Sequence, residues 1–552
     1  MTVARLPLTQ KIESRTASTA KDSRAVNCYF EGRGQQEAGN TVKRPGLVEV
    51  AVSPAISAST AQGMYRWNGA LYVVTSNTLY KITTGLVKTT VGTLTGTVQN
   101  VYWAESANNS YLFLHNGTNG YVLSSTGAFT TVLSTSVYEV SILTGGTGYV
   151  APTVTFSAPP SGTTATGTVQ SSGGVITGVT LTNVGSGYVS APTATIAGAP
   201  GVNCTTSVTL NGFPSGAGLL ATGAVYLDGY TVVATKAGQL YNSDLNDPRF
   251  WNPLNFTSAE ADPDNIVGIV KHINYICVFG IWGTEYFYDA ANATGSPFNR
   301  QESYKTEIGC PNGASIIQFQ QAVIFVGNSK IHGKTAFVLD GVTPKPISTR
   351  YIEKYLNADT TSDLQAFAFR IEGHTFYVLN MPTLDKTFVY DMDEQEWYEW
   401  TSYYSSAEHV FRIWTATEFN NATYGLHTSN GKILTIGVDT YLDDGTAIYF
   451  RVITNNLDSG SMRRKFYQSG QIVGDKVSAT MSISHSDNDF VSWSTARTVD
   501  LSKARSIIYQ CGWARRRAWQ FLVTDNVPLR LSAFEINLEG GEMEGDPQLE
   551  RK

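Results

Sequence analysis

Carboxylates and tryptophans alternate in one short stretch of the chain, where Glu394, Glu396 and Glu399 flank Trp397 and Trp400. Paired carboxylates beside aromatic rings are typical of sites that cleave sugars. On a strand, however, Glu394 and Glu396 point to one face and Glu399 points to the other. This separation favours an exposed strand edge over a glycosidase site.

Other motifs that could hold an ion or a phosphate fail on their spacing. Residues 391–394 (Asp-Met-Asp-Glu) and 443–445 (Asp-Asp-Gly) lack the twelve-residue calcium loop with its terminal glutamate. Residues 333–335 (Gly-Lys-Thr) follow Gly327 one residue too late for a P-loop, and the next residues have the pattern of a strand. The seven histidines are scattered without a close pair. We therefore predict no catalytic residue, no metal and no cofactor.

Two arginine clusters near the end of the chain are the strongest candidates for a binding surface. Arginine and tryptophan are enriched at the centres of protein interfaces. If residues 513–519 form one strand, Arg515 and Arg517 share a face with both tryptophans, and Arg516 lies on the other. We predict a subunit or partner interface that contains Arg463, Arg464, Arg515, Arg516, Arg517, Trp513 and Trp519.

Neutral polar residues dominate this chain of 552 residues, because only 15% of them are charged where about a quarter is usual. The length predicts two or three folding units. The net charge of −6 argues against a surface that grips DNA through its phosphates. The five cysteines are far apart and odd in number, which predicts reduced thiols. No run of 18 apolar residues occurs, so we predict no membrane insertion by this chain.

Short strands separated by tight turns recur along most of the chain. Residues 69–82, 110–123 and 224–234 alternate apolar and polar side chains around turns such as Asn116-Gly117 and Asp228-Gly229. Such units recur roughly every 40 to 60 residues, a spacing typical of propeller blades, although a set of β-sandwiches shares the pattern. We predict an all-β fold, a β-propeller with an inserted small β domain and a C-terminal β module. One short helix is predicted at residues 351–357.

Residues 138–212 differ from their surroundings, with almost no charge and many Gly, Thr, Val and Pro residues. Residues 145–156 are echoed at residues 184–196, each with a Gly-Thr/Ser-Gly-Tyr turn before an Ala-Pro-Thr strand start. The regular apolar alternation argues against a flexible linker. We predict a small two-repeat β domain inserted between blades.

Longer apolar strands follow residue 455, and residues 539–552 carry five acids without an apolar pattern. The chain is therefore expected to divide into an N-terminal arm with the first strands (1–62), a first group of blades (63–137), the inserted domain (138–212), a second group of blades (213–455), a C-terminal β module or closing blades (456–540) and an acidic tail (541–552).

Residues 241–268 (YNSDLNDPRFWNPLNFTSAEADPDNIVG) form the most specific stretch of the sequence. Together with residues 279–288 and 43–47, they resemble the packaged-DNA stabilisation proteins of short-tailed phages (podoviruses), which are the tail accessory or nozzle subunits. The resemblance covers roughly residues 1–137 and 213–540 and leaves out the insertion.

This motif also has a physical interpretation of its own. Asn and Asp side chains cap turns and prolines fix φ, which predicts a rigid loop between blades. Phe250, Trp251, Leu254 and Phe256 are expected to be buried anchors. We assign structural roles to Asn242, Asp244, Asn246, Asp247, Pro248, Trp251, Phe256, Pro263 and Gly268.

The resemblance implies a structural virion protein and not an enzyme. It implies six copies in a ring below the portal and head-to-tail adaptor proteins, in contact with a tail plug or needle and with a tailspike or tail fibre. The ring would retain packaged DNA and let it pass through the lumen without tight binding. The protein would belong to the virion tail after assembly in the host cytoplasm. The alternative is a carbohydrate-binding or glycan-degrading propeller tail protein.

Overall fold

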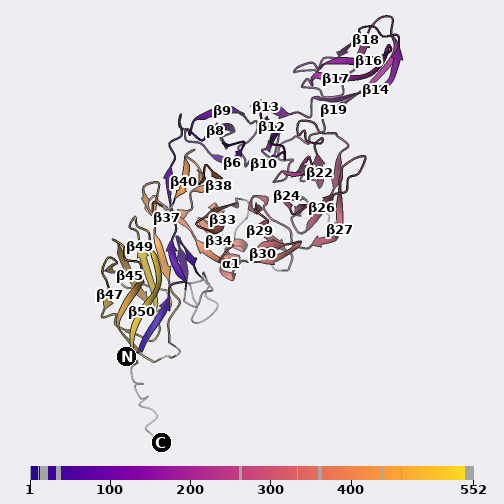
Figure 1. Cartoon of the computed structure of the whole chain (residues 1–552). Coiled ribbons are helices and arrows are strands. Elements are labelled where there is room, and N and C mark those ends of the chain that lie inside the picture. The colour runs from indigo at the N-terminus through magenta and orange to yellow at the C-terminus, as the bar shows by residue number, and fades with distance from the viewer. Residues whose placement is uncertain are drawn as a thin grey trace.

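The computed structural model describes residues 2–9, 12, 23–32, 39–259, 264–331, 333–358, 363–437, 439–459, 461 and 463–540. Strands dominate this part of the chain, and its one α-helix is α1 (Arg350–Ala358). The predictions of an all-β fold and of a short helix at residues 351–357 are therefore confirmed. Among these residues, no helix has the length and apolar character needed to cross a membrane. Figure 1 shows a ring of sheets, a small domain that projects from it, and a sandwich on the opposite side.

The ring is a β-propeller, which confirms the predicted fold. Five separate four-stranded sheets and parts of two larger sheets stand around a centre. The innermost strands contact one another in the order β6, β10, β20, β24, β28, β32 and β38, and β38 returns to β6. This closed circle gives seven blades in the described part of the chain.

Each blade pairs its strands in antiparallel order from the centre outwards. Blade 1 holds β6 (Ala61–Trp67), β7 (Ala70–Thr75), β8 (Thr78–Ile82) and β9 (Lys88–Thr93). Blade 2 holds β10 (Tyr102–Glu105), β11 (Tyr111–His115), β12 (Gly120–Ser124) and β13 (Phe129–Val132). Blade 3 holds β20 (Val225–Leu227), β21 (Tyr230–Ala234), β22 (Gln239–Asn242) and β23 (Phe256–Ser258). Blade 4 holds β24 (Ile266–His272), β25 (Tyr275–Gly280), β26 (Thr284–Asp289) and β27 (Phe298–Thr306).

The later blades carry the remaining short elements of the ring. Blade 5 holds β28 (Ile317–Phe319), β29 (Ala322–Ser329), β30 (Gly333–Asp340) and β31 (Thr343–Pro346), with the 3-10 turn η1 (Gly313–Ser315) before it and α1 after it. Blade 6 holds β32 (Gln365–Ile371), β33 (His374–Met381), η2 (Pro382–Leu384), β34 (Lys386–Asp391) and β35 (Glu396–Glu399). The ribbon β36 (Thr401–Tyr404) and β37 (Ala407–Val410) leads to blade 7, which holds β38 (Ile413–Phe419), β39 (Ala422–His427) and β40 (Ile433–Gly437).

A strand from the beginning of the chain closes the ring. β5 (Gly46–Glu49) precedes blade 1 in sequence but pairs with β40 as the next strand of blade 7. On its other side it meets β41 (Leu442–Asp443), which turns into β42 (Thr446–Ala447). Gly46 permits this crossing, since a Cβ there would lie 2.3 Å from the carbonyl oxygen of Leu442. The first and last blades are thereby fastened together.

The inserted domain pairs its strands across its internal repeat. The first repeat gives β14 (Val137–Thr147), β15 (Thr153–Phe156) and β16 (Thr166–Ser172), and the second gives β17 (Val175–Asn183), β18 (Ala194–Ala197) and β19 (Val202–Leu210). β14 pairs with β19, β15 with β18, and β16 with β17. Tyr149 and Tyr188 occupy equivalent places, where each hydroxyl accepts a backbone N–H, from Cys204 and Ala165 respectively. The domain also has its own apolar core.

Two sheets pack into a sandwich that combines both ends of the described chain. The outer sheet contains β1 (Thr2–Pro7), β3 (Cys28–Glu31), β4 (Asn40–Lys43), β44 (Lys465–Gly474), β47 (Ser506–Tyr509), β48 (Trp513–Ala514) and β50 (Arg530–Gly540). The shared sheet contains β2 (Arg24–Val26), β43 (Phe450–Ile453), β45 (Thr480–Ser486), β46 (Arg497–Asp500) and β49 (Ala518–Val523). It is called shared because β2 also pairs with β35, which joins blade 6 to the sandwich in one sheet.

Candidate functional site

The predicted arginine–tryptophan cluster is divided between the surface and the core of the sandwich. Trp513 is 52% exposed on the outer sheet, and the guanidinium of Arg464 lies 4.1 Å from the centre of its ring. Arg463 and Arg515 are exposed nearby. Arg516 forms an ion pair with Asp489. These residues are brought together at one corner of the sandwich.

The expectation that residues 513–519 form one strand is wrong. β48 ends at Ala514 in the outer sheet and β49 begins at Ala518 in the shared sheet, so the chain crosses from one layer to the other between them. Trp519 therefore points into the core and is 1% exposed. Arg517 is also buried, with both carboxylate oxygens of Asp487 at 2.6 and 2.7 Å. Neither residue is available to a partner.

The motif of residues 241–268 runs from the end of β22 to the start of β24, and its central residues 243–255 form the loop between β22 and β23, within blade 3 rather than between blades. Trp251 is fully buried against Phe113 of blade 2 and Phe213, and its Nε1 donates to the carbonyl of Pro248 at 2.8 Å. The loop therefore connects two strands of one blade but packs against the neighbouring blade.

Several residues of this motif hold the base of the inserted domain. Asp244 accepts a hydrogen bond of 2.9 Å from the hydroxyl of Tyr138 at the start of β14. The pKa of Asp244 is raised above its ordinary value, because the effect of burial outweighs the lowering by the hydrogen bond from Tyr138. The side-chain nitrogen Nδ2 of Asn211, at the end of the insertion, donates to the backbone carbonyl of Arg249 at 2.9 Å. The loop therefore supports the insertion as well as the blade.

The remaining motif residues have separate structural tasks. Asn246 adopts a φ of +58° and accepts from the Tyr226 hydroxyl, while Asp247 pairs with Arg249. Asn242 is buried and donates to the Ser243 carbonyl. Gly268 leaves room for Thr222, whose Oγ1 would lie 2.4 Å from a Cβ.

Not every predicted anchor of this motif is buried. Leu254 is 75% exposed because it follows Pro253 in a turn, where its N–H is held by the Asn252 side chain. Phe256 is 37% exposed and packs beside Tyr241. Pro263 lies outside the described residues.

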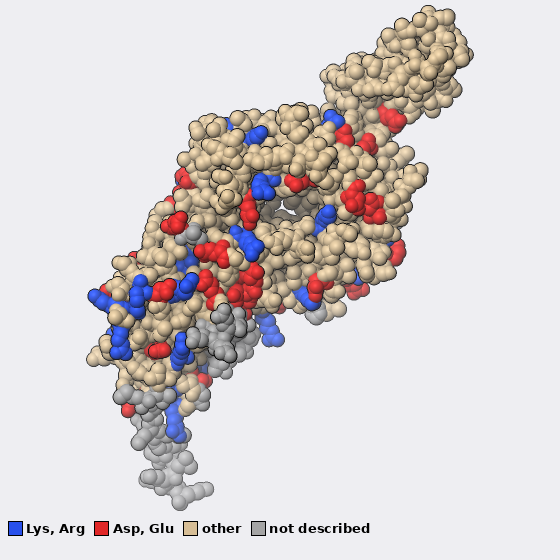
Figure 2. Space-filling view, in the orientation of Figure 1, with Lys and Arg blue, Asp and Glu red and all other residues tan. Residues whose placement is uncertain are grey.

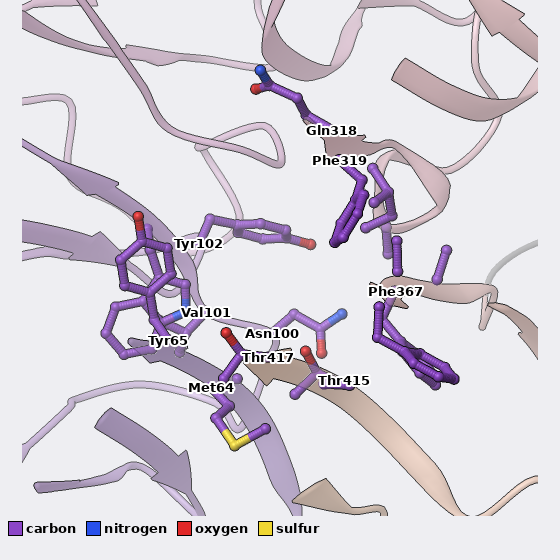
Figure 3. Close-up of a pocket in the computed structure, with 18 of the residues that line it drawn as sticks. Met64, Tyr65, Asn100, Val101, Tyr102, Gln318, Phe319, Phe367, Thr415 and Thr417 are labelled. Atoms are coloured by element: carbon purple, nitrogen blue, oxygen red, sulfur yellow. The ribbon is translucent and has the colours of Figure 1, made fainter. Parts of the chain in front are cut away.

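The centre of the propeller contains a cavity of about 580 Å³. Its wall combines aromatic rings with amide and hydroxyl groups, including Tyr102, Phe319, Phe367, Gln318 and Thr415 (Figure 3). Burial raises the pKa of Tyr102 to about 12, so its hydroxyl is neutral at pH 7. The charged residues in the wall are Arg66, Glu105 and Glu418. The wall therefore suits a polar molecule, with three charged groups among mostly uncharged side chains.

The carboxylates beside Trp397 and Trp400 are structural, and the expectation of an exposed strand edge is wrong. Glu396 and Glu399 lie in β35 and are 8% and 5% exposed, because β2 covers the edge of that strand. Glu399 pairs with Lys386. The described residues contain no group of three or more His, Cys, Asp or Glu side chains suited to a metal ion.

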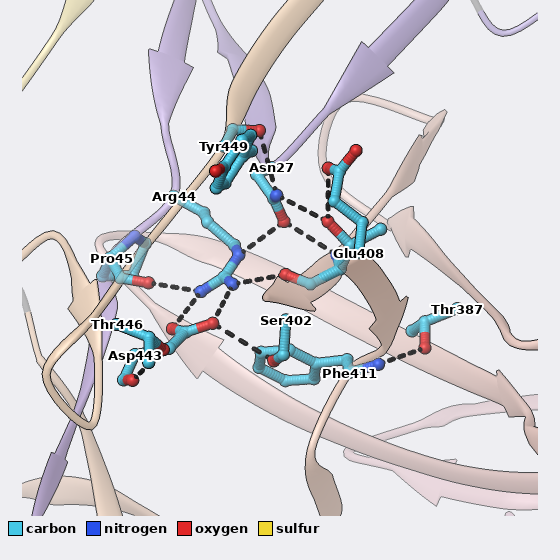
Figure 4. Close-up of polar contacts among 11 residues, drawn as sticks. Asn27, Arg44, Pro45, Thr387, Ser402, Glu408, Phe411, Asp443, Thr446 and Tyr449 are labelled. Atoms are coloured by element: carbon cyan, nitrogen blue, oxygen red, sulfur yellow. Dashed lines mark hydrogen bonds and ion pairs between the residues drawn. The ribbon is translucent and has the colours of Figure 1, made fainter. Parts of the chain in front are cut away.

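The Asp443-Asp444-Gly445 turn holds an arginine instead of calcium. The two terminal guanidinium nitrogens of Arg44 donate to the Asp443 carboxylate, at 2.9 and 2.5 Å (Figure 4). Arg44 also donates to the Asn27 side chain at 2.9 Å and to the Thr401 carbonyl at 2.8 Å. The network joins the outer sheet, the ribbon after blade 6 and the strand after blade 7, and it was not predicted from the sequence.

Residues 220–438 match a protein-family model described as Bacteriophage P22 Gp10, beta-propeller. Among curated proteins, the chain is similar to the Tail hub protein gp10 of Salmonella phage P22, with 23% identity over 143 residues, or 25% of this chain. The chain spans 30% of the length of that relative in this match.

Two solved structures share a general likeness with the chain. The extracellular domain of a hybrid two-component system from B. thetaiotaomicron is 10% identical, with 76% of this chain and 46% of that chain covered and a TM-score of 0.37. BamB from Moraxella catarrhalis is 8% identical, with 70% and 97% covered and a TM-score of 0.32. The resemblance predicted from the sequence is confirmed over residues 220–438, which match the phage stabilisation family of β-propellers.

Proposed function

We propose that the chain is a structural subunit of a phage tail, in a nozzle ring that continues the channel of the portal and adaptor. The observation that carries this proposal is the match of residues 220–438 to a phage propeller family that includes a tail hub protein. The proposed ring has six copies, seated against the adaptor and in contact with a tail plug or needle and a tailspike or fibre.

This role requires interfaces rather than bond chemistry. Four groups that could be reactive have structural surroundings: burial raises the pKa of Cys277 and Cys310, and the carboxylates of Glu399 and Asp443 are paired with cations. A retained DNA molecule under pressure needs a ring whose parts do not separate. The shared sheet and the strand β5 supply such connections within each subunit.

The ring is proposed to let DNA pass without tight binding. Tight phosphate contacts need a surplus of Lys and Arg, whereas this chain has a net charge of −6. Residues 140–227 contain no Lys, Arg, Asp or Glu at all, and Figure 2 shows the projecting domain as almost free of charged side chains. Retention would then depend on a physical gate formed by this ring or by a plug.

A glycan-binding propeller is the second candidate, because most side chains in the wall of the central cavity are neutral polar or apolar, with several aromatic rings among them. Titration of the purified chain with neutral oligosaccharides separates the two candidates. A lectin-like role would be favoured if the natural chain releases heat on binding an oligosaccharide and the variants Tyr102→Ala and Phe367→Ala do not.

The proposal is tested on virions produced without the chain. They should package DNA and then lose it, while the purified chain restores stable full heads. Stable full heads without the chain would remove the retention role.

A further inference from the structure

The outer sheet of the sandwich has a solvent face whose composition can be derived from strand register. Buried residues such as Tyr467, Ile536 and Phe534 point to the core, so the alternate positions point outwards. One row across this face holds Glu539, Phe466 and Trp513, which are register partners. The next row holds Val3, Asn537, Ser469 and Tyr509. We call these two rows, with Arg463, Arg464 and Arg515, the aromatic face.

The aromatic face exposes three large aromatic side chains and a valine to solvent. Trp513 is 52% exposed, Tyr509 60%, Phe466 43% and Val3 62%. Three half-exposed aromatic side chains present roughly 300 Å² of mostly apolar surface, given about 200 Å² for each ring side chain. This area reaches the lower end of the range found for the largest apolar patch on a monomer, which is often functional.

One anchor of the aromatic face is already held in place. The Arg464 guanidinium stacks at 4.1 Å over the Trp513 ring, and Phe466 stands beside Trp513 on the paired strand. Lys465 secures this corner from beneath, because its ammonium group donates to the carbonyl oxygen of Arg515. Since the ring and the guanidinium are ordered before binding, little conformational entropy is lost when a partner covers them.

The charge around the face indicates the chemistry of the partner. Three exposed or half-buried arginines, Arg463, Arg464 and Arg515, are close to Trp513 in sequence or across the paired strands, and the Arg464 guanidinium stacks on its ring. Acidic groups on a partner complement such a rim. Glu539 and Glu535 stand on the same face and would repel a continuous line of phosphates, which favours a protein over DNA.

A second copy of the chain is a poorer fit for the aromatic face. A two-fold contact centred on Trp513 would bring the arginines of one copy opposite those of the other, so a second copy could bind only through another, acidic surface, as neighbours in a ring do. We propose that the aromatic face docks a different tail protein, whose contact surface has an apolar centre and a rim of carboxylates. This inference rests on the proposed role in a tail and names the surface through which the subunit is seated there.

The test uses the full chain and virions that lack it. The double variant Trp513→Ala with Phe466→Ser and the charge reversal Arg464→Glu should each reduce incorporation into these particles at least tenfold. Incorporation of the natural chain should weaken as salt rises, and Arg464→Lys should lie between the natural chain and Arg464→Glu. Val491→Ser is the control, because Val491 is 75% exposed in the loop between β45 and β46 of the shared sheet and belongs to neither row of the aromatic face.

Folding is checked separately by the melting temperature of each variant. Substitutions at these exposed positions should leave it nearly unchanged. Normal incorporation of both disruptive variants would overturn the docking surface and leave the tail role intact, whereas failure of the natural chain to incorporate would overturn both. Loss of self-association in the double variant would assign the face to a second copy. Loss of duplex DNA binding in the double variant would assign it to nucleic acid.

Discussion

The guanidinium of Arg44 and the carboxylate of Asp443 form a two-point ion pair, with side chains 0% and 2% exposed. Arg44 follows the outer-sheet strand β4, and Asp443 follows the last blade. The pair therefore fixes the passage from sandwich to propeller at the point where β5 closes the ring.

Removal of one partner should leave an unpaired buried charge. We expect Asp443→Asn to lower the free energy of unfolding by about 3 kcal/mol or more, because breaking a buried pair costs that amount. Urea unfolding followed by tryptophan fluorescence measures the change, since Trp400 lies 5.6 Å from the Arg44 guanidinium. The matched control is Asp340→Asn, which breaks the exposed pair with Lys345 and should leave the midpoint unchanged. Equal midpoints for the two variants would show that the Arg44 network has no special role.

Acid should destabilise the fold through His115. Its Nδ1 accepts from the Gly117 N–H and its Nε2 lies 2.8 Å from the Gly223 carbonyl, so the buried ring has no place for a second proton. Burial lowers the pKa of His115 to about 4 from 6.5. The contribution of His115 to the free energy of unfolding is therefore fully present above pH 6.5. It is lost as the pH falls towards 4, because in this range the unfolded chain binds a proton that the folded chain does not.

The variant His115→Gln should reduce this pH dependence. Between pH 7 and pH 4.5, its loss of unfolding free energy should be smaller than that of the natural chain by roughly 2 kcal/mol. His427 contributes in the same direction, because burial lowers its pKa to about 4. His374 acts in the opposite direction. Burial lowers its pKa, but the hydrogen bond and charge of the Asp391 carboxylate help to leave the pKa above its ordinary value. Its contribution to stability is therefore lost as the pH rises. Identical pH profiles for variant and natural chain would contradict the assignment to His115.

Two glycines in the inserted domain separate steric crowding from backbone strain. Gly146 and Gly173 have nearly equal φ values of +60° and +59°. A Cβ at Gly146 would lie 2.4 Å from the Val202 carbonyl oxygen, whereas a Cβ at Gly173 would meet nothing within 4 Å. Gly173→Ala should cost about 1 kcal/mol from strain, and Gly146→Ala should cost about 1 to 3 kcal/mol more. Hydrogen exchange of the β14 and β19 amides measures both, and equal protection would contradict the crowding.

Deletion of the insertion should leave the propeller folded. The Asn211 N–H donates to the Ser136 carbonyl at 2.9 Å, so the two ends of the insertion are already adjacent. A chain in which Ser136 is joined to Asn211 should keep the β-sheet signal in circular dichroism. Its melting temperature should lie within a few degrees of that of the natural chain, which corresponds to a change of about 1 kcal/mol in the free energy of unfolding. An insoluble or unfolded product would show that the propeller depends on this domain.

The sequence allowed prediction of what depends on neighbouring residues. Hairpins such as β11–β12 and β20–β21 follow from local alternation and from Asn-Gly and Asp-Gly turns, and α1 follows from a short amphipathic stretch. The closure of the ring by β5, and the placement of β1 to β4 in the sandwich, depend on pairs hundreds of residues apart, for which a single sequence has no signal.

The arginine–tryptophan cluster shows the same limit. Residue types identified an interface candidate, but only the crossing between β48 and β49 separates exposed Trp513 from buried Trp519. Arg44 was missed because its partner, Asp443, had the local pattern of a turn. A lone arginine before Pro45 gave no sign of a buried partner so distant in the chain.

The central claim is that this chain is a ring-forming subunit of a phage tail. Isolated tails imaged by electron microscopy and weighed by native mass spectrometry test it most directly. We predict six copies of the chain in one ring around the DNA exit. Tails with one or three copies, or tails that lack the chain, would contradict this account.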